Sequence, residues 1–193
     1  MKRVLLGILC VTLSAVGLSA EIWNLDAGHS KLRFTAEARM ISADGVFRKF
    51  DVKADINDQA LEKSQIEVTV DMTTIDTNSD RRDNHLKSPD FFDVAKFPTS
   101  TIKITGIRKV SDTNYEADAQ VTIRDVTKQV KLPARVLLNE GGILRFRGTV
   151  ELNRMEYGVK YNSGMNKIEE AVSVTYELNL RKPRPQGQGA PKK

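Results

Sequence analysis

The sequence predicts an all-β protein, an antiparallel up-and-down β-barrel of about eight strands with a short helical cap inserted at 78–97. Three observations predict this fold. Apolar and polar residues alternate through most of the chain, turn-forming residues separate the alternating segments, and 75–98 does not alternate. Period-two alternation marks strands with one buried face, which is typical of antiparallel sheets. Strands joined mostly in sequence order favour a barrel, and a sandwich is the alternative.

Each alternating segment supplies one expected strand, and Gly, Asn or Asp lies at several of the junctions. The expected strands are 31–40, 49–56, 65–72, 102–104, 115–123, 130–132, 144–153 and 172–180. The turn residues between them are Asn57-Asp58, Asp112-Thr113-Asn114, Glu140-Gly141-Gly142 and Asn162-Ser163-Gly164.

The apolar face of these strands contains many small residues, including Ala36, Ala38, Ala54, Ala119 and Gly148. A barrel of about eight strands encloses room for side chains or for one small ligand. Since protein interiors pack densely, small inward residues predict a hollow, hydrophobic lumen. The alternative is that small residues face large ones where a barrel tapers, and the pattern leaves both open. The residues predicted to line the lumen and hold a ligand are Leu32, Phe34, Ala36, Ala38, Phe50, Val52, Ile66, Val68, Val70, Ile102, Ile104, Ala117, Ala119, Phe146, Gly148, Val174 and Tyr176.

The stretch 75–98 is too long for an ordinary hairpin connection and too rich in aromatic residues for a solvated loop. Ser79 is expected to cap a short helix that ends at His85 or Leu86, and Ser88-Pro89 to start a second one. The aromatic residues should dock this cap on the barrel mouth, with polar groups as a latch. The predicted cap and latch residues are Asp76, Arg82, Asp83, His85, Phe91 and Phe92.

No convincing catalytic constellation is present, so we expect a protein that is not an enzyme and needs no cofactor. A metal-assisted hydrolase using His29, His85 and Asp76 is the alternative, although two histidines without a fixed short spacing are weak evidence for zinc. Ser30 and His29 are neighbours on an extended chain, so their side chains point apart. No Gly-x-Ser-x-Gly motif occurs.

The two ends of the chain differ from its body. Residues 1–20 have a basic start, an apolar run and small residues at 17, 19 and 20, which predicts a cleaved signal peptide and a periplasmic location. The only cysteine, Cys10, falls in this segment. Residues 181–193 form a basic tail that we expect to be disordered. The body, 21–180, has 23 basic and 25 acidic residues, so the basic excess belongs to the ends and no nucleic-acid partner is expected.

Several motifs, taken together and in this order, resemble the YceI-like family. They are Asp26-x-x-His29-Ser30, Gly45-Val46-Phe47, Ile75-Asp76-Thr77, Arg82-Asp83-x-His85-Leu86-Lys87, Asp90-Phe91-Phe92-Asp93, Lys96-Phe97-Pro98, Val121–Lys128 and Asn153-Arg154-x-x-Tyr157-Gly158-Val159. The family commonly has glycine where Asp125 stands and phenylalanine where Tyr157 stands.

This resemblance implies a lipocalin-like barrel that is exported by bacteria and holds a long-chain isoprenoid or another amphiphilic lipid. It also implies a binding or carrier role without catalysis. The ligand-free alternative is a sealed barrel that acts as an envelope stress or scaffold protein. A transient contact with a membrane stays open, as does the oligomeric state.

Overall fold

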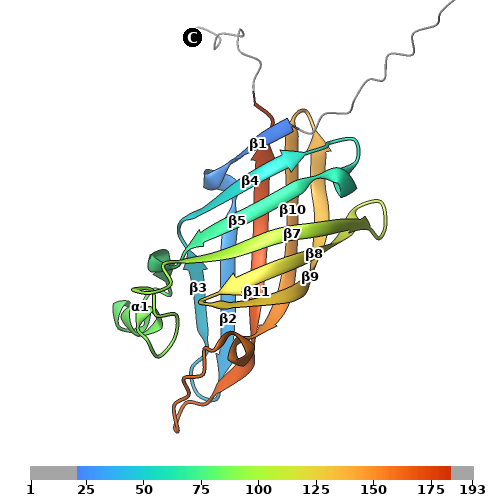
Figure 1. Cartoon of the computed structure of the whole chain (residues 1–193). Coiled ribbons are helices and arrows are strands. Elements are labelled where there is room, and N and C mark those ends of the chain that lie inside the picture. Colours follow the sequence, from blue (N-terminus) through green and yellow to red (C-terminus); the bar gives the residue numbers. More distant parts are fainter. Residues whose placement is uncertain (1–20, 184–193) are drawn as a thin grey trace, which may run out of the picture.

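The computed structural model describes residues 21–183, and these form the all-β barrel that the alternation predicts (Figure 1). The first half contains the short strands β1 to β6, and the second half contains the long strands β7 to β11. The strands are β1 (Glu21–Leu25), β2 (Lys31–Ala38), β3 (Ala43–Phe47), β4 (Phe50–Ile56), β5 (Gln65–Asp71), β6 (Ile75–Asp76), β7 (Thr99–Lys109), β8 (Asn114–Ile123), β9 (Val126–Glu140), β10 (Ile143–Asn153) and β11 (Ile168–Arg181).

The short strands join end to end into three longer ones. β4 pairs with β5 and β3 pairs with β6, so 43–56 and 65–76 run antiparallel along their whole lengths. β1 and β2 likewise follow one another against β4 and β3. The interruptions are the 3-10 turns Ala27–His29 and Met72–Thr74 and the bend at 48–49, where the Arg48 amide donates to the Thr74 carbonyl. The barrel therefore has eight strands in sequence order.

Strand β11 closes the ring. One of its edges pairs with β10 from Ile143 to Asn153. Its other edge pairs with β2 over 168–177 and then with β1 at Leu180 and Arg181. Each of the eight strands formed in this way thus has a partner on both sides over part of its length, which removes the open edges of a sheet. The predicted antiparallel up-and-down barrel of about eight strands is confirmed.

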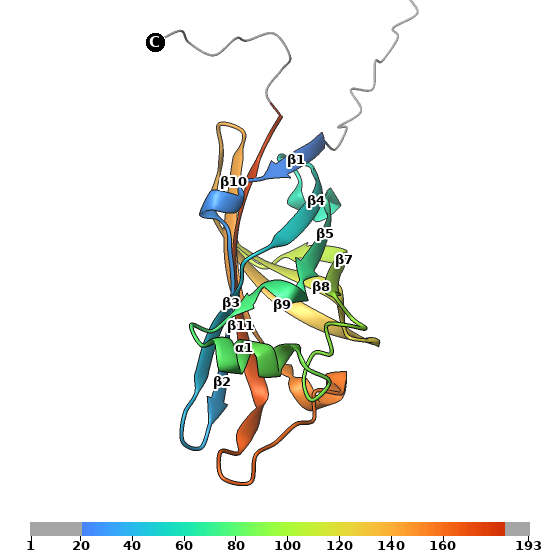
Figure 2. The same ribbon diagram turned by 90° about the vertical axis from the view of Figure 1, so that its left-hand side faces the viewer.

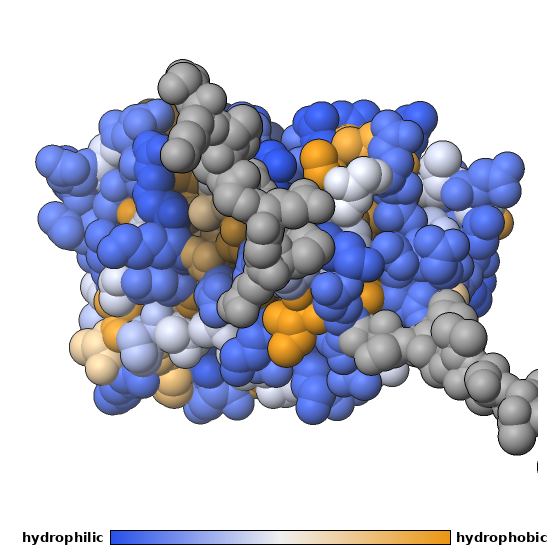
Figure 3. Space-filling model, turned by 90° about the horizontal axis from the view of Figure 1, so that it is seen from above, coloured by the Kyte–Doolittle hydropathy of each residue, from blue (hydrophilic) through white to orange (hydrophobic). Residues whose placement is uncertain are grey.

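The end of the barrel where β1 meets β11 is tightly packed. Trp23, Ile56 and Leu180 are completely buried there, and Leu144 and Leu178 pack with them. We call this the packed end. Seen from this side, the surface is mostly hydrophilic with isolated hydrophobic side chains (Figure 3). The β2–β3 hairpin and the 158–167 loop lie at the opposite end (Figure 1).

The cap contains one helix, α1 (Asp80–Lys87), which lies against the side of the barrel (Figure 2). Its start at Ser79 agrees with the prediction, but the Ser79 side chain makes no capping hydrogen bond. The predicted second helix at Ser88-Pro89 is wrong. The amides of Phe92 and Val94 donate to the Leu86 and Lys87 carbonyls, so the chain folds back on the end of α1 in turns.

The predicted signal peptide, 1–20, and most of the predicted tail lie outside the described residues. Within 21–183, none of the helices combines the length and the apolar character that crossing a bilayer demands.

Candidate ligand site: an apolar cavity along the barrel

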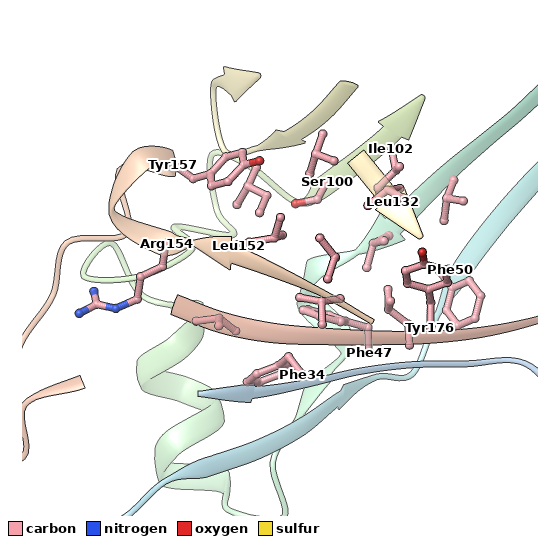
Figure 4. A pocket seen from close by; sticks show the side chains of 18 of the residues that line it. Phe34, Phe47, Phe50, Ser100, Ile102, Leu132, Leu152, Arg154, Tyr157 and Tyr176 are labelled. Atoms are coloured by element: carbon pink, nitrogen blue, oxygen red, sulfur yellow. The ribbon is translucent and has the colours of Figure 1, made fainter. Parts of the chain in front are cut away.

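A cavity of about 560 Å³ lies inside the barrel. At the packed end it stops against Leu61, Leu144 and Leu178, which are all buried. At the other end it reaches Ile41 of the β2–β3 hairpin and Asn166 of the 158–167 loop. Inward-facing apolar residues of both halves of the chain line it, and some of them are labelled in Figure 4. The small inward residues therefore mark real space over much of the barrel.

Fourteen of the seventeen predicted lumen residues line this cavity. They are Leu32, Phe34, Ala36, Ala38, Phe50, Ile66, Val68, Val70, Ile102, Ile104, Ala117, Phe146, Val174 and Tyr176. Whether they contact a ligand stays a prediction.

Val52, Ala119 and Gly148 do not line the cavity, which corrects the prediction for these three. Val52 belongs to the core of the packed end, and Ala119 is completely buried beside Tyr157. At Gly148, a Cβ would clash with the Tyr176 side chain and with the Pro133 carbonyl oxygen. Glycine at 148 therefore makes room for a tyrosine and leaves none for a ligand.

The end opposite the packed end is the mouth of the cavity. The Ile41 side chain lines the cavity and is also 68% exposed, so the cavity opens beside it. His85 of α1 meets Tyr161 edge-on at 4.7 Å between ring centroids, and both pack against Phe91. This aromatic cluster joins the cap to the 158–167 loop. His85 Nε2 also lies 2.9 Å from Asp90 Oδ2.

The polar groups of the cap bind one another and the chain where it leaves β6. Asp83 is buried, and its Oδ1 accepts hydrogen bonds from the Thr77 amide and hydroxyl. Arg82 donates to the Thr77 hydroxyl and carbonyl oxygens. Asp76 accepts from the Asn78 amide and from Arg48, and these bonds, of which the one from Asn78 is the larger cause, hold the pKa of its carboxyl below the ordinary value. Phe92, Phe91, His85 and Arg82 line the cavity, whereas Asp76 and Asp83 do not.

Arg154 fixes the loop on the other side of the mouth, a role that was not predicted from the sequence. Its buried guanidinium donates to the carbonyl oxygens of Val159, Tyr161, Ile168 and Glu169, at distances between 2.7 and 3.0 Å. Asn153 starts the preceding 3-10 turn by accepting from the Met155 amide. The Asn153-Arg154-x-x-Tyr157 motif is the sequence signal that could have identified Arg154 as a residue of the mouth.

Two cavity-lining residues with hydroxyl groups were also absent from the residues predicted to line the lumen. Ser100 lies on the inward face of β7, two residues before Ile102, and Tyr157 ends the 3-10 turn after β10. Ser100 could have been found by extending the β7 alternation two residues toward its start. Phe47 and Tyr115 line the cavity as well.

The residues of the hydrolase alternative do not form a joint site. His29 binds Asp26, which also pairs with Arg181. His85 binds Asp90, and Asp76 binds Arg48. Between 21 and 183, no three His, Cys, Asp or Glu residues are grouped as a metal ion requires.

The comparison with known families is decisive. The model of the YceI-like domain matches residues 23–180. This chain belongs to the YceI-like family. It is 30% identical over 139 residues to the UPF0312 protein of Azotobacter vinelandii, covering 69% of this chain and 72% of that protein. It is 32% identical over 143 residues to Protein YceI of Salmonella newport, covering 71% and 74%.

Solved structures of the same architecture support the fold. BcnA of Burkholderia cenocepacia superposes with a TM-score of 0.75 at 18% identity, covering 81% of this chain and 99% of that one. The YCEI protein of Campylobacter jejuni gives 0.70 at 20% identity, with coverage of 76% and 88%. A polyisoprenoid binding domain of Saccharophagus degradans gives 0.67 at 15% identity, with coverage of 83% and 98%.

Proposed function

We propose that this protein is a binding or carrier protein that holds a long-chain isoprenoid, or a similar amphiphilic lipid, in its barrel. One observation carries the proposal: the barrel contains an apolar cavity of about 560 Å³ that ends blindly at the packed end and opens at the mouth. This volume falls in the range of about 300–1,000 Å³ that is common for ligand pockets. The polyisoprenoid-binding domain among the structural neighbours supports the same ligand class.

The chemistry of the cavity suits an alkyl or prenyl chain. Its wall is made largely of Leu, Ile, Val, Phe and Ala side chains. Each methylene transferred from water to such a surface contributes roughly 0.8 kcal/mol before ordering costs. Affinity should therefore rise with chain length until the cavity is full, and it should depend little on salt.

The proposal includes export and a role without catalysis. The basic start and short apolar run of residues 1–20 support cleavage and release into the periplasm. The binding role is supported by the cavity itself, whose lining is mostly apolar. The intact mass of protein from the envelope should lack about the first 20 residues.

We include a transient membrane contact at the mouth in this proposal. Met40, Ile41 and Met165 are strongly exposed there, with Met165 at 80%. Asn166 ties the two tips together, because its amide oxygen accepts from the Met40 and Ile41 amides. The tip segments 39–42 and 160–167 contain three cationic residues and no acidic one, which suits a bilayer with anionic lipids.

The ligand is tested by native mass spectrometry of protein purified from its own host, followed by titration with prenyl alcohols of increasing length. We expect a co-purified lipid and affinities that climb with length. Affinities that do not change with chain length, or a protein that binds no lipid in either experiment, would contradict the carrier hypothesis and favour the scaffold alternative. Membrane contact is tested by co-sedimentation with phosphatidylglycerol vesicles, comparing the protein with Met40→Ser and Met165→Ser.

A further inference from the structure

The outer face of strands β9, β10, β11 and β2 carries a row of basic side chains. Arg135 of β9 lies directly opposite Arg147 of β10. Glu177 of β11 lies between Arg147 and Lys31 of β2, and these three strands run side by side (Figure 1). Arg33, two residues after Lys31, extends the row along β2. All four basic residues are exposed, and we call them the basic face.

The protein does not neutralise the charge of this face. Glu177 accepts from Arg145, and this bond lowers the pKa of its carboxyl, with further contributions from the charges of Lys31 and Arg147. Within residues 21–183, no ion pair engages any of the four residues of the basic face. Like charges directly opposite in a sheet are destabilising, so the Arg135–Arg147 pair lowers stability. The face therefore keeps a net positive charge that the fold itself does not require.

A groove of about 410 Å³ adjoins the basic face on the outside of β2, β3 and β6. Arg33 lines it, and so does Thr175, which lies opposite Arg33 in the β2–β11 pairing. The groove wall also contains the Asn78 amide and the Asp76 carboxylate, so it offers both hydrogen-bond donors and acceptors. A sugar hydroxyl both donates and accepts hydrogen bonds, whereas a simple anion only accepts them. The wall of the groove therefore suits a carbohydrate.

The other side chains of these strands disfavour other classes of partner. On β9, β10, β11 and β2, Leu137 is the only large hydrophobic side chain among those that are strongly exposed between 21 and 183. Stable protein interfaces have an apolar centre, which this face lacks. No phenylalanine, tyrosine or tryptophan on the four strands is exposed to stack on a base, as proteins that bind single-stranded nucleic acids require. What the face does offer is arginine, whose guanidinium matches the geometry of carboxylate and phosphate groups.

We propose that the basic face and the adjoining groove bind an acidic polysaccharide. Its carboxylate or phosphate groups pair with the exposed basic residues, and one of its sugars occupies the groove beside Arg33. Neighbouring strands lie about 4.8 Å apart, so the row from Arg135 to Lys31 spans roughly 14 Å and meets a short stretch of a sugar chain. This site lies on the outside of the barrel. The inference therefore goes beyond the proposed lipid-binding function and does not depend on it.

The test titrates three probes into the protein at low ionic strength: alginate oligosaccharides, neutral dextran oligosaccharides and polyphosphate with the same number of charges as the alginate. Alginate should bind most tightly, dextran should not bind, and added salt should weaken alginate binding. Arg33→Gln and Arg135→Gln should each weaken alginate binding by about two- to fivefold, as expected for single exposed ion pairs. Lys53→Gln is the matched control, because it removes one exposed positive charge from β4, away from the basic face.

Two further measurements separate the site from a general effect of charge. Val46→Trp should fill part of the groove without changing the charge, so it should weaken the binding of alginate but not of polyphosphate. Arg135→Gln should melt at or above the temperature of the wild-type protein, because it removes a like-charged pair. Prenyl alcohol binding should be unchanged in all these variants.

Four results would overturn the inference. Alginate might fail to bind at low salt, or Lys53→Gln could weaken its binding as much as Arg135→Gln does. Polyphosphate that binds as tightly as alginate, with no effect of Val46→Trp, would show a general polyanion surface without a carbohydrate site. A larger effect of Arg135→Gln on binding to phosphatidylglycerol vesicles than on binding to alginate would assign the face to a membrane.

Discussion

Strands β4 and β9 have the same kind of sequence pattern but very different surroundings. β4 alternates apolar and polar residues, and three of its seven residues, Val52, Ala54 and Ile56, are buried. β9 alternates over fifteen residues without a single buried one. Val52 and Ala54 of β4 lie in the core of the packed end and do not line the cavity, whereas Leu132 and Ala134 of β9 line the cavity. Alternation therefore identifies the inward face of a strand, but not whether that face meets a core or empty space.

The small residues show the same division. Ala36, Ala38 and Ala117 line the cavity. The other three each lie beside a large aromatic side chain. Ala54 is directly opposite Trp23, Ala119 packs in the cluster of Tyr157, and the Gly148 position is covered by Tyr176. Both interpretations of the small residues thus hold, each in a different part of the barrel.

The strongest test of this contrast is one substitution made in both regions. Leu180→Ala removes a completely buried side chain from the packed end. It should lower the free energy of unfolding by about 2–5 kcal/mol, because the lost transfer energy adds to the cost of the cavity that remains. Leu132→Ala removes the same atoms from the cavity wall, where one side of the leucine already faces empty space. Its effect should be no more than about half as large.

Both values are measured by urea unfolding of delipidated protein. Equal losses at the two positions would mean that the barrel is packed near Leu132 and has no empty space beside this side chain. If the region is hollow, added lipid should stabilise the wild-type protein more than Leu132→Ala, because the variant makes fewer apolar contacts with the ligand.

Gly148→Ala tests the part of the barrel where a small residue makes room for a large one. The new methyl group would meet Tyr176 and the Pro133 carbonyl oxygen, which accepts a hydrogen bond from the Tyr176 hydroxyl. We expect a loss of about 1–3 kcal/mol, as for other cases of overpacking. Thermal unfolding compared with Gly106→Ala provides the control, since a Cβ at Gly106 would meet only a carboxylate oxygen at ordinary contact distance. Equal stability of the two variants would contradict the close packing at Gly148.

Ala36→Trp tests a small residue that faces open space. Its side chain should fill part of the cavity, so the protein should stay within about 1 kcal/mol of wild type and lose lipid binding. Lys31→Trp, on the same strand but exposed at the outer face, should leave both properties nearly unchanged. Binding is followed by prenyl alcohol titration and stability by melting temperature. A large loss of stability in lipid-free Ala36→Trp would indicate a packed core at this position.

Much of the fold could be predicted because one local rule, alternation, identifies most of the strands, although it missed the short strands β1, β3 and β6. The site was harder because it depends on contacts between residues far apart in the sequence. Tyr176 covers Gly148 from the neighbouring strand β11. Arg154 binds carbonyls of a loop whose path no local pattern predicts. The prediction of a second helix after Ser88 was wrong for a similar reason, because the chain there folds back and its amides donate to the last carbonyls of α1.

The smallest expected effect concerns the charges that hold the packed end closed. Asp26 accepts hydrogen bonds from His29 and from Arg181 of the closing strand β11. Both bonds lower the pKa of Asp26 below its ordinary value of 3.8, and the bond from His29 has the larger effect. Because the folded-state pKa is the lower one, the stabilisation is fully present above pH 3.8 and is lost as the pH falls through the folded-state value. Asp26→Asn should therefore be slightly less stable than wild type at pH 7, and the two proteins should become equally stable below pH 3.8.

Asp76→Asn, near the cap, is the comparison variant and should differ less from wild type. The largest cause of the lowered pKa of Asp76 is the Asn78 amide, and an asparagine oxygen can still accept that hydrogen bond. Urea unfolding between pH 7 and pH 2 measures both differences. A gap between Asp26→Asn and wild type that persists unchanged to pH 2 would show that the carboxylate charge does not contribute to closing the barrel.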